Sequence, residues 1–530
     1  MGEGASLVAG YVIRRNEYHD SVFLMRVARR ISEQKGVLQA AALMGTEKNK
    51  VLLEEIGIGG KEIDSATPGD LVIAVQAEDG EVLAAVLGNV EGWLRTSPDP
   101  PGAIPLRTLE EALSRQPRSN LAVISVPGEY AAREARRALE RGLNVFLFSD
   151  HVPMQDERSL KDFARGKGLI VMGPDCGTAI IGGKGIAFAN AVRRGPIGVI
   201  GASGTGIQEF TCLVHHAGCG ISHAIGTGSR DLSDEIGGIS VLSALESLEA
   251  DPKTKAIAIL SKPPGKHAFH QILSGIRACS KPVVACFLGM ARSPEQDKYP
   301  FQSCRTLDEA AAAAVRLVAG AEKLFIPGTT VDFRTLLARE KAHMKPGQKF
   351  LRGLFAGGTF CYQAQQILQD ARIRVYSNSP LEGNPRLPDP SQSREHTLVD
   401  MGADEFTSGR PHPMIDSGQR RERILAEARD QEVAVLLLDF ILGFNASADP
   451  AGELIPAITG AKDEARKRGG FLCVVASVCG TEEDSQGFAK QVKSLEGAGA
   501  VVFPSNARSA DFCAALIRSL QGVPDGGQGQ

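Results

Sequence analysis

Short, fully apolar runs that end in glycine-rich loops recur along this chain of 530 residues. The run Ile197–Ile200 leads into Gly-Ala-Ser-Gly-Thr-Gly at 201–206, and the run Ile221–Ile225 leads into Gly-Thr-Gly-Ser-Arg-Asp at 226–231. A strand that is apolar throughout is typical of a parallel sheet covered by helices on both faces. The pattern therefore predicts an α/β fold whose ligands bind at the carboxyl ends of the strands.

The same loops predict anion binding. Where a strand turns directly into a helix, the first backbone N–H groups lack partners and carry a partial positive charge, which a phosphate satisfies. A third loop of this kind follows the run Phe350–Phe355. The expected phosphate or ligand contacts are Ser203, Gly204, Thr205 and Gly206, then Gly226, Thr227, Gly228 and Ser229, and finally Gly357, Gly358 and Thr359. The alternative is that these loops are tight turns that bind nothing.

The pattern divides the chain into four regions, as its length requires more than one core. Residues 1–96 are predicted to form a small α+β domain, in which the apolar runs 8–13, 37–44, 71–75 and 82–87 alternate with helical stretches. Residues 120–192, 193–322 and 349–522 each repeat the sequence strand, loop, helix. Within the last region, the long polar stretch from Asn378 to Arg421 is predicted to be a functional or mobile loop.

Composition excludes several classes of function. A hydrophobic content of 43% and a charged content of 23% are ordinary for a globular protein, and a net charge of −3 gives no reason to expect nucleic acid or an anionic membrane as partner. No apolar span is long enough for a membrane helix, so the cytoplasm is the expected location. None of the ten cysteines forms a CxxC pair, and no metal site is predicted.

Other polar residues are candidates for catalysis or ligand contact. Arg230 offers a planar guanidinium suited to phosphate or carboxylate. Asp175 and Cys176 follow the predicted strand at 169–172 and so lie at its carboxyl end. In Arg-Pro-His-Pro-Met-Ile-Asp at 410–416, two prolines stiffen the backbone around a histidine. Here His412 is a candidate proton donor or general acid, with Arg410 and Asp416 as orienting partners. An ordered surface loop is the alternative.

Several of these motifs occur in one order that resembles a known family. The order is Gly-Pro-Asp-Cys-Gly at 173–177, the loop at 201–206, the loop at 226–231, Gly237-Gly238 and Asp-Pro-Lys-Thr at 251–254. It resembles the α subunit of succinyl-CoA synthetase and the wider ADP-forming acyl-CoA synthetases. Residues 350–520 resemble the carboxyl-terminal domain of the β subunit, fused behind it. The fused arrangement, with the motif at 410–416, looks most like the FdrA family.

The resemblance implies a fold for each region. Residues 120–192 would be a Rossmann-like, CoA-binding-type domain. Residues 193–322 would be a flavodoxin-like domain of the synthetase α type, and residues 349–522 a flavodoxin-like domain of the β carboxyl-terminal type.

The chain also departs from the synthetases. Their phosphohistidine follows the fourth strand of the second domain, where this chain reads Phe-Leu-Gly-Met-Ala-Arg-Ser-Pro at 287–294. Their histidine-orienting glutamate would follow the third strand, where this chain reads Ser-Lys-Pro-Pro-Gly at 261–265. No region resembles an ATP-grasp fold. The chain alone is therefore not expected to couple ATP hydrolysis to thioester formation.

The resemblance to FdrA implies a subunit of a carbamoyltransferase of the oxamate carbamoyltransferase type. Such an enzyme moves a carbamoyl group between oxalurate and phosphate in allantoin and purine catabolism, with other pathway subunits as partners. A glycine loop would hold phosphate or carbamoyl phosphate, and Arg230 or Arg410 would hold the carboxylate of the small substrate. CoA is a further possible ligand. Two alternatives stay open: an ATP-dependent carboxylate–CoA ligase, and an inactive scaffold that binds CoA or nucleotide.

Overall fold

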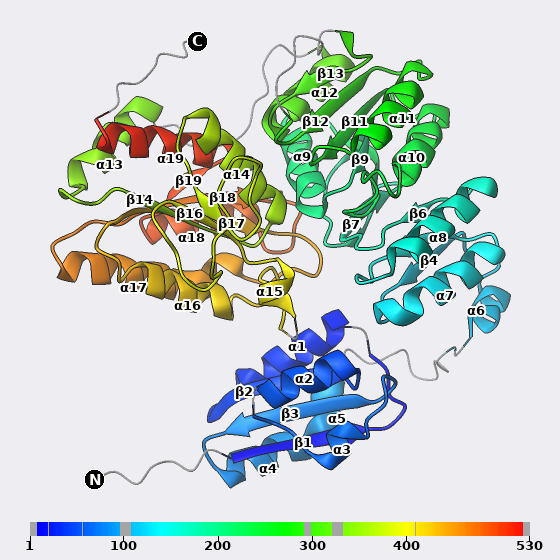
Figure 1. The fold of residues 1–530 in the computed structure, drawn as a ribbon, viewed down its shortest axis with the longest axis horizontal. Helices are drawn as coiled ribbons and strands as arrows, with labels where there is room; N and C mark the ends of the chain where they lie inside the picture. The colour runs from blue at the N-terminus through cyan, green and yellow to red at the C-terminus, as the bar shows by residue number, and fades with distance from the viewer. Residues whose placement is uncertain are drawn as a thin grey trace. The chain divides into compact units, whose positions relative to one another are not determined.

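The computed structural model describes residues 8–19, 21–55, 57–95, 106, 108–290, 298–320, 332–408 and 410–522. They belong to two compact units (Figure 1). The first contains Met1–Ser119 together with Phe406–Asp416, and the second contains Asn120–Glu405 together with Ser417–Gln530. In the described residues, no helix is both long enough and apolar enough to span a bilayer.

The first unit is built on a three-stranded antiparallel sheet of order β1-β3-β2. Its elements are β1 (Val8–Arg14), α1 (Ser21–Ser32), β2 (Val37–Met44), α2 (Glu47–Glu55), α3 (Lys61–Asp64), β3 (Leu71–Ala77), α4 (Gly80–Gly88), α5 (Val90–Leu94) and α6 (Leu109–Arg115). Three of the four predicted apolar runs are strands. The fourth, 82–87, lies in α4, because Asp79 caps the N–H groups of Glu81 and Val82 and starts a helix there.

The central strand β3 is buried on both faces, and its side chains alternate between two clusters. Leu71, Ile73 and Val75 pack with residues of α1 and α4, whereas Val72 and Ala74 pack on the opposite face with residues from 53 to 66. This alternation explains why β3 reads as a continuous apolar run in the sequence.

A buried carboxylate organises the loops beside β3. Asp70 accepts hydrogen bonds from Thr67 N at 2.7 Å, from Asn16 N at 2.8 Å and from Arg15 Nη1 at 2.8 Å. The backbone N–H of Thr67, together with that of Asn16 and the guanidinium of Arg15, holds the pKa of Asp70 well below its usual range. Asp70 thereby ties the β1–α1 loop to the loop that precedes β3.

The second unit begins with a small parallel sheet of order β4-β5-β6. Its elements are β4 (Leu121–Ile124), α7 (Gly128–Glu140), β5 (Asn144–Leu147), α8 (Met154–Gly166) and β6 (Val171–Met172). Strand and helix alternate as the sequence predicts for residues 120–192.

A seven-stranded sheet of order β13-β12-β11-β9-β10-β7-β8 follows. Its elements are β7 (Thr178–Ile181), β8 (Lys184–Ala187), β9 (Arg194–Gly201), α9 (Gly204–His216), β10 (Ile221–Gly226), α10 (Ile239–Ala250), β11 (Ala256–Ser261), α11 (Lys266–Arg277), β12 (Val283–Phe287), β13 (Gln302–Cys304) and α12 (Leu307–Ala319). The strands β9 to β13 are parallel and run in the order second, first, third, fourth, fifth, which is flavodoxin-like. The hairpin β7–β8 extends one edge.

The third sheet has the order β15-β16-β14-β17-β18-β19 and is parallel throughout. Its elements are α13 (Phe333–His343), β14 (Phe350–Phe355), α14 (Gly358–Asp370), β15 (Tyr376–Ser377), β16 (Thr397–Asp400), α15 (Asp404–Thr407), α16 (Gly418–Glu427), β17 (Val433–Ile441), α17 (Pro450–Lys467), β18 (Cys473–Cys479), α18 (Phe488–Gly497), β19 (Val501–Phe503) and α19 (Asn506–Leu520). From β16 to β19 the order is again flavodoxin-like.

The structure differs from the sequence prediction in the polar stretch 378–421. It contains the strand β16, whose four residues are all buried, and the start of α16. A four-residue strand inside a polar stretch has too few apolar residues to show a period, although it occupies the second position of the sheet.

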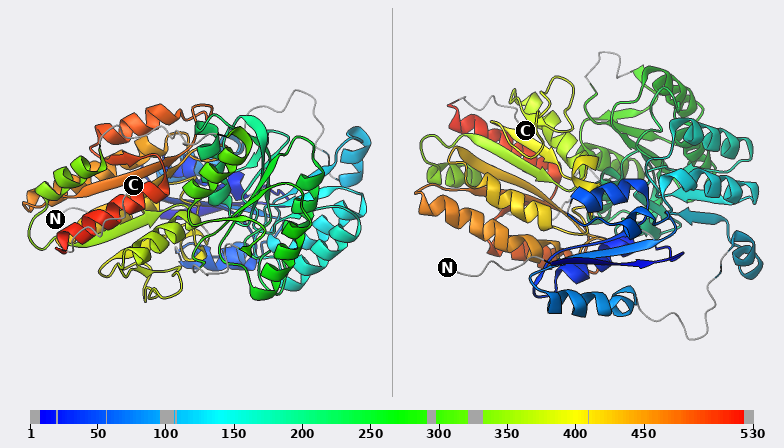
Figure 2. Two further views of the ribbon diagram at one scale, coloured as in Figure 1. Left: turned by 90° about the horizontal axis from the view of Figure 1, so that it is seen from above. Right: turned by 60° about the horizontal axis from the view of Figure 1, so that its bottom comes forward.

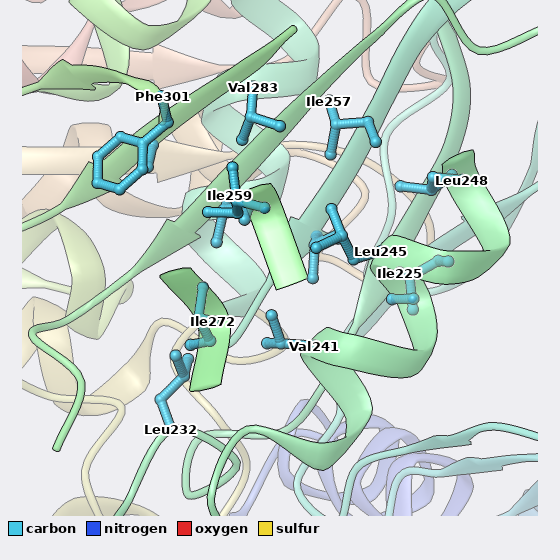
Figure 3. Close-up of a cluster of buried hydrophobic side chains, with 14 of the residues drawn as sticks. Ile225, Leu232, Val241, Leu245, Leu248, Ile257, Ile259, Ile272, Val283 and Phe301 are labelled. Atoms are coloured by element: carbon cyan, nitrogen blue, oxygen red, sulfur yellow. The ribbon is translucent and has the colours of Figure 1, made fainter. Parts of the chain in front are cut away.

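Helices cover both faces of the two larger sheets (Figure 2). In the seven-stranded sheet, α10 and α11 pack over one face. Figure 3 shows the core between them and the strands, where Val241 and Leu245 of α10 and Ile272 of α11 meet Ile257 and Ile259 of β11. On the third sheet, α14 packs with α19, and α16 packs with α17. The predicted class, a small α+β domain followed by Rossmann-like and flavodoxin-like α/β regions, is confirmed.

The Asp70 network predicts a local effect on stability. Asp70→Ala leaves the partly buried backbone N–H groups of Asn16 and Thr67 without their acceptor, which costs about 1–3 kcal/mol. We expect faster hydrogen exchange in β1 and β3 of the full chain, measured by mass spectrometry. Because folding lowers the pKa of Asp70, its contribution is present above the ordinary aspartate pKa and is lost as pH falls below it. Asp64→Ala, at an exposed position of α3, is the control; equal exchange in both variants would contradict the role of Asp70.

Candidate functional site

Helices α9 and α14 begin at the same place in the second unit (Figure 1). The hydroxyls of Ser203 and Thr359, one in front of α9 and one in the first turn of α14, are hydrogen-bonded to each other. A Cβ on Gly357 would lie 3.2 Å from Thr205 Cβ, so the two loops are in close contact. Two of the three predicted anion-binding loops, 203–206 and 357–359, therefore form one site.

The order of the strands explains why these loops meet. In the seven-stranded sheet, β9 lies between β10 and β11, and in the third sheet β14 lies between β16 and β17. Successive connections leave opposite faces of the sheet at such a switch point, which opens a crevice at the carboxyl ends of the strands. The loops after β9 and β14 stand at these two points, and α9 packs against α14.

Four backbone N–H groups at the site are available to a ligand. The N–H of Gly206 donates to Ser203 Oγ, and the N–H of Gly357 donates to Asp439 Oδ2. Within the described ranges, the N–H groups of Gly204, Thr205, Gly358 and Thr359 have no acceptor. Both helix N-termini thus bring unsatisfied donors and a partial positive charge to the same point.

A buried ion pair fixes the second loop. Asp439, two residues before the end of β17, is fully buried and accepts from Ala356 N at 2.8 Å and Gly357 N at 2.7 Å. Arg420 Nη2 donates to Asp439 Oδ1 at 2.8 Å and also to the carbonyl of Leu354. The pair ties α16, β14 and β17 together, so the loop before α14 is held in place before any ligand arrives.

A second carboxyl lies against the first residue of α14. Asp400 ends β16, and its Oδ2 lies 2.5 Å from the position that a Cβ on Gly358 would occupy. Its Oδ1 accepts from Gly402 N at 3.0 Å. Burial raises the pKa of Asp400 to about 6, against the opposing effect of the Lys262 charge. A glycine at 358 is required because this carboxyl fills the space beside it.

Lys262 brings a cation to the same site. It follows β11, the strand next to β9, and its Nζ lies 4.9 Å from the ring centroid of Tyr362 in the first turns of α14. Lys262 is exposed, and its charge lowers the pKa of both Asp400 and Cys361. The site therefore combines two helix N-termini, one ammonium group and one titratable carboxyl.

The loop Gly226, Thr227, Gly228 and Ser229 has a different environment from the other two. The sequence predicted a helix directly after it, but α10 begins only at Ile239. The carboxylate of Asp231 accepts from Ser240 N at 3.1 Å and from Val241 N at 3.0 Å, so it caps α10 in place of an external anion. Gly226 and Gly228 are glycines because they pack against the 173–178 loop; a Cβ would lie 2.4 Å from Cys176 Sγ or 2.2 Å from Pro174 O, respectively.

Arg230 is engaged by protein groups. Its Nη2 lies 2.8 Å from Glu157 Oε2 and 2.7 Å from the carbonyl of Val152. Glu157 in turn accepts from Lys161, which is fully buried and also donates to Asp231 at 2.7 Å. The sequence predicted that Arg230 binds a substrate carboxylate. To do so, the guanidinium of Arg230 would have to contact the substrate and Glu157 together, or break its ion pair with Glu157.

Asp175 and Cys176 lie between the two groups of loops. The Asp175 carboxyl is hydrogen-bonded to Ser229, and its pKa is raised to about 6 by burial and by the nearby charges of Asp150 and Asp404. Cys176 is buried, and burial raises its pKa to about 12, so it is not a thiolate at neutral pH. The same segment reaches the start of α9, since a Cβ on Gly204 would contact Thr178 Oγ1 at 3.1 Å.

Next to Asp175, a histidine joins two exposed carboxylates. His151 Nδ1 lies 2.9 Å from Asp150 Oδ1, and His151 Nε2 lies 3.2 Å from Asp404 Oδ2. Over the described residues, this trio is the group whose His and Asp ligand atoms lie close enough together, within 4.8 Å, to be compared with a metal site. Both ring nitrogens already face carboxylates. We call Asp150, His151, Asp175 and Asp404 the acidic cluster.

The predicted residues Arg410, His412 and Asp416 belong to the first unit, unlike all the other predicted site residues. His412 Nδ1 accepts from Met414 N at 3.2 Å, and the carbonyl of His412 accepts from Asp416 N at 3.1 Å. Arg29 of α1 donates to the carbonyl of Ile415 at 2.6 Å. The segment is therefore a tight turn bound to α1, and Arg410 is exposed.

Sequence reasoning missed four residues of the site: Lys262, Asp400, Arg420 and Asp439. Three of them could have been found from their positions, because Lys262, Asp400 and Asp439 each stand within two residues of the carboxyl end of a strand. Arg420 has no such signal, since only the packing of α16 brings it to Asp439.

Three families match parts of the chain. A CoA-ligase family matches residues 354–516, and a CoA binding domain family matches residues 192–289. A family described as the AllF heavy metal-associated domain matches residues 8–103. The CoA-binding match covers the strands β9 to β12 of the seven-stranded sheet, and the CoA-binding-type domain at 120–192 stays a prediction.

Among curated proteins, the Escherichia coli (strain K12) protein YahF is 44% identical over 497 residues, which cover 93% of this chain and 96% of YahF. The chain belongs to the YahF family. The α subunit of the ADP-forming succinate–CoA ligase of Methanothermobacter thermautotrophicus is 29% identical over 187 residues, 35% of this chain and 62% of that subunit. This similarity to a succinate–CoA ligase subunit, together with the CoA-ligase and CoA-binding matches, places the chain in the ADP-forming acyl-CoA synthetase superfamily.

Solved structures match more distantly. An acetyl-coenzyme A synthetase of Ca. Korarchaeum cryptofilum, in its apo form, is 16% identical, with a TM-score of 0.32, over 76% of this chain and 84% of that one. A likeness this weak supports no conclusion about the site.

The residues of the first unit do not fit a heavy-metal site. Soft metals prefer thiolate ligands, and the first cysteine of the chain is Cys176, far beyond residues 8–103. The histidine of that range, His19, pairs with Glu17 and packs against Phe23. In the part of the first unit that the structure describes, no three His, Cys, Asp or Glu side chains bring their ligand atoms together. No step proposed below uses a metal in this unit.

The Asp439–Arg420 pair predicts a test of how the second loop is held. Asp439→Ala leaves a buried guanidinium and two backbone N–H groups without their acceptor, and we expect a loss of about 3–5 kcal/mol in the free energy of unfolding. Urea unfolding of the full chain measures it. The double variant Asp439→Leu/Arg420→Met should lose less, because no charge stays buried. Glu432→Gln, at an exposed pair, is the control; a loss below about 1 kcal/mol for Asp439→Ala would contradict the clamp.

Proposed function

We propose that this chain transfers a carbamoyl group between a small amide-bearing substrate and phosphate, with the phosphate bound between the N-termini of α9 and α14. The observation that carries the proposal is the convergence of four unpartnered N–H groups at the contact of Ser203 and Thr359. The relation to the FdrA family, expected from the sequence, is part of the proposal.

The geometry suits a doubly charged oxyanion. A hydrogen bond to a charged group contributes about 1.5–3 kcal/mol, and each helix N-terminus adds about half a positive charge. Lys262 supplies a full positive charge beside α14. Positioned donors of this kind also stabilise the charge that develops on oxygen when phosphate attacks a carbonyl carbon.

The distribution of histidines supports direct reaction with phosphate. The chain has no histidine between His270 and His343, so the loop after β12 cannot carry the phosphohistidine of the synthetases. In the proposed reaction, a phosphate oxygen bonds to the carbamoyl carbon and the carbon–nitrogen bond breaks. The nitrogen leaves with a proton, giving carbamoyl phosphate and an amide.

The acidic cluster favours a carbamoyl group over a carboxylate at the far end of the site. Its carboxylates accept hydrogen bonds, as an amide NH₂ requires, and they repel a second carboxylate. The cluster adjoins the anion site on two sides, since Asp404 follows Asp400 on one loop and the 173–178 segment contacts Gly204. A carboxylate elsewhere on the substrate would face Lys262.

The reaction is proposed to take place in the cytoplasm and in a complex with other subunits of the pathway. Oxalurate is the proposed carbamoyl donor, and phosphate or carbamoyl phosphate is the proposed ligand. Arg410, His412 and Asp416 stay candidates for contacts to the substrate or to a partner subunit.

A second candidate is an ATP-dependent carboxylate–CoA ligase. It is favoured by the matches to the CoA-ligase and CoA-binding families and by the similarity to a succinate–CoA ligase subunit. The diphosphate of CoA is an anion that helix N-termini also hold. This candidate needs a nucleotide site on another subunit and a phosphoryl carrier other than a histidine after β12.

Gly358→Ala tests the anion site without any partner. The added Cβ would lie 2.5 Å from Asp400 Oδ2 and push the carboxyl and the first turn of α14 apart. We expect phosphate affinity, measured by calorimetry, to fall about tenfold or more, which is the loss of one charge-assisted hydrogen bond. Gly497→Ala, in α18 with open space around it, is the matched control. Unchanged phosphate binding in Gly358→Ala would contradict the site.

The reaction itself separates the candidates. The full chain with its partner subunits should release carbamoyl phosphate from oxalurate and phosphate. A thioester formed from ATP, CoA and a carboxylate would instead establish the ligase. Ligand binding with neither product would leave the scaffold alternative.

A further inference from the structure

We propose that Asp400 is the proton-transfer group of the anion site: it takes up a proton when a doubly charged anion binds, and gives that proton to the atom that leaves the carbamoyl carbon. The proposal rests on the proposed function for the identity of the leaving atom. The proton uptake rests on the anion site alone.

The position of Asp400 carries the proposal. It is 92% buried, yet its Oδ2 has no hydrogen-bond donor among the described residues, while Oδ1 is satisfied by Gly402 N. Oδ2 lies beside Gly358, 2.5 Å from the position that a Cβ would occupy, and the N–H of Gly358 is one of the four donors without an acceptor. An anion bound to that N–H therefore lies next to an unpartnered carboxyl oxygen.

A bound anion and the ionised carboxylate of Asp400 repel each other when they are in contact. A proton shared between them removes this repulsion. Groups on the neighbouring elements favour either the neutral or the ionised form of Asp400. Lys262, from the loop after β11, favours the carboxylate, whereas Asp439 of β17 and Glu405 of α15 disfavour it. On α14 the neighbour is Cys361, a buried thiol. Lys262 is exposed, whereas Asp439 lies in β17 of the same sheet as Asp400 and Glu405 lies in the helix α15 that follows β16.

The carboxyl of Asp400 alone can supply and take back the proton that the transfer requires. Neutral Asp400 donates its proton to the nitrogen of the leaving amide as the carbon–nitrogen bond breaks. The resulting carboxylate then accepts the proton of the hydrogen phosphate, whose oxygen has bonded to the carbamoyl carbon. Asp400 is neutral again, no oxidant or further reactant is needed, and the reverse reaction uses the same steps.

Sulfate is the probe, because it keeps two negative charges over the whole range tested and needs no partner subunit. With the wild-type full chain, sulfate affinity should fall about tenfold or more between about pH 5 and pH 8, as Asp400 ionises next to the anion. Burial raises the free carboxyl's pKa to about 6, so the fall should be centred at or above that pH. Calorimetry near neutral pH, in buffers of different ionisation enthalpy, should show uptake of up to one proton per sulfate.

The variant Asp400→Asn keeps the shape of the side chain and the acceptor for Gly402 N. It should bind sulfate with an affinity that no longer depends on pH and without proton uptake, and its transfer activity should be lost while phosphate binding persists. Asp389→Asn, at an exposed turn of the same domain, should behave as wild type. If Asp400 had only a structural role, the substitution Asp400→Asn would lower the affinity for sulfate equally at all pH values.

The outcomes distinguish the two proposals. If wild-type protein binds no sulfate, the anion site and with it the proposed function fail. If sulfate binds without pH dependence and without proton uptake, the role of Asp400 is overturned while the anion site stands. The uptake measurement uses only wild-type protein, so the test does not depend on the folding of Asp400→Asn.

Discussion

The structure of the site depends on the contact between two helix N-termini. Ser203 and Thr359 hydrogen-bond to each other, and small residues on both sides let the loops before α9 and α14 touch. Two like partial charges would repel at this distance unless an anion lay between them. The fold holds the termini together by packing α9 against α14 and by clamping the second loop to Asp439. Binding energy is therefore available to a ligand, because the protein has already met the cost of bringing the donors together.

Charges of both signs lie around this contact. Lys262 lies on the side of the α9–α14 contact that comes from the seven-stranded sheet, and Asp400 lies on the side that comes from the third sheet. In the proposed reaction, the acidic cluster offers hydrogen-bond acceptors to the amide of the substrate. At the loop 226–229 the charges are paired within the protein: Asp231 caps α10, Lys161 donates to Asp231 and to the carbonyl of Thr227, and Glu157 pairs with Arg230. The buried charge of Asp231 thus fixes the loop 226–229, whereas the exposed charge of Lys262 is left for a ligand.

The sequence predicted the fold well where strands are buried on both faces. The predicted runs 37–44 and Phe350–Phe355 have the same bounds as the strands β2 and β14. The prediction was wrong where the surrounding structure, rather than the local pattern of apolar residues, decides the element. β16 is short and flanked by polar residues, and α10 starts late because Asp231 supplies the cap. For the site, the loops 203–206 and 357–359 were identified separately, but their contact joins residues 156 positions apart and leaves no local signal.

The most direct test of the account is a crystal structure of the full chain with selenate, located by its anomalous scattering. Selenate has the charge and shape of sulfate, and its selenium identifies it against solvent. We expect a selenium peak between α9 and α14, with oxygens at hydrogen-bond distance from the N–H groups of Thr205 and Thr359. A peak only at the loop 226–229, or no ordered selenate at either helix terminus, would contradict it.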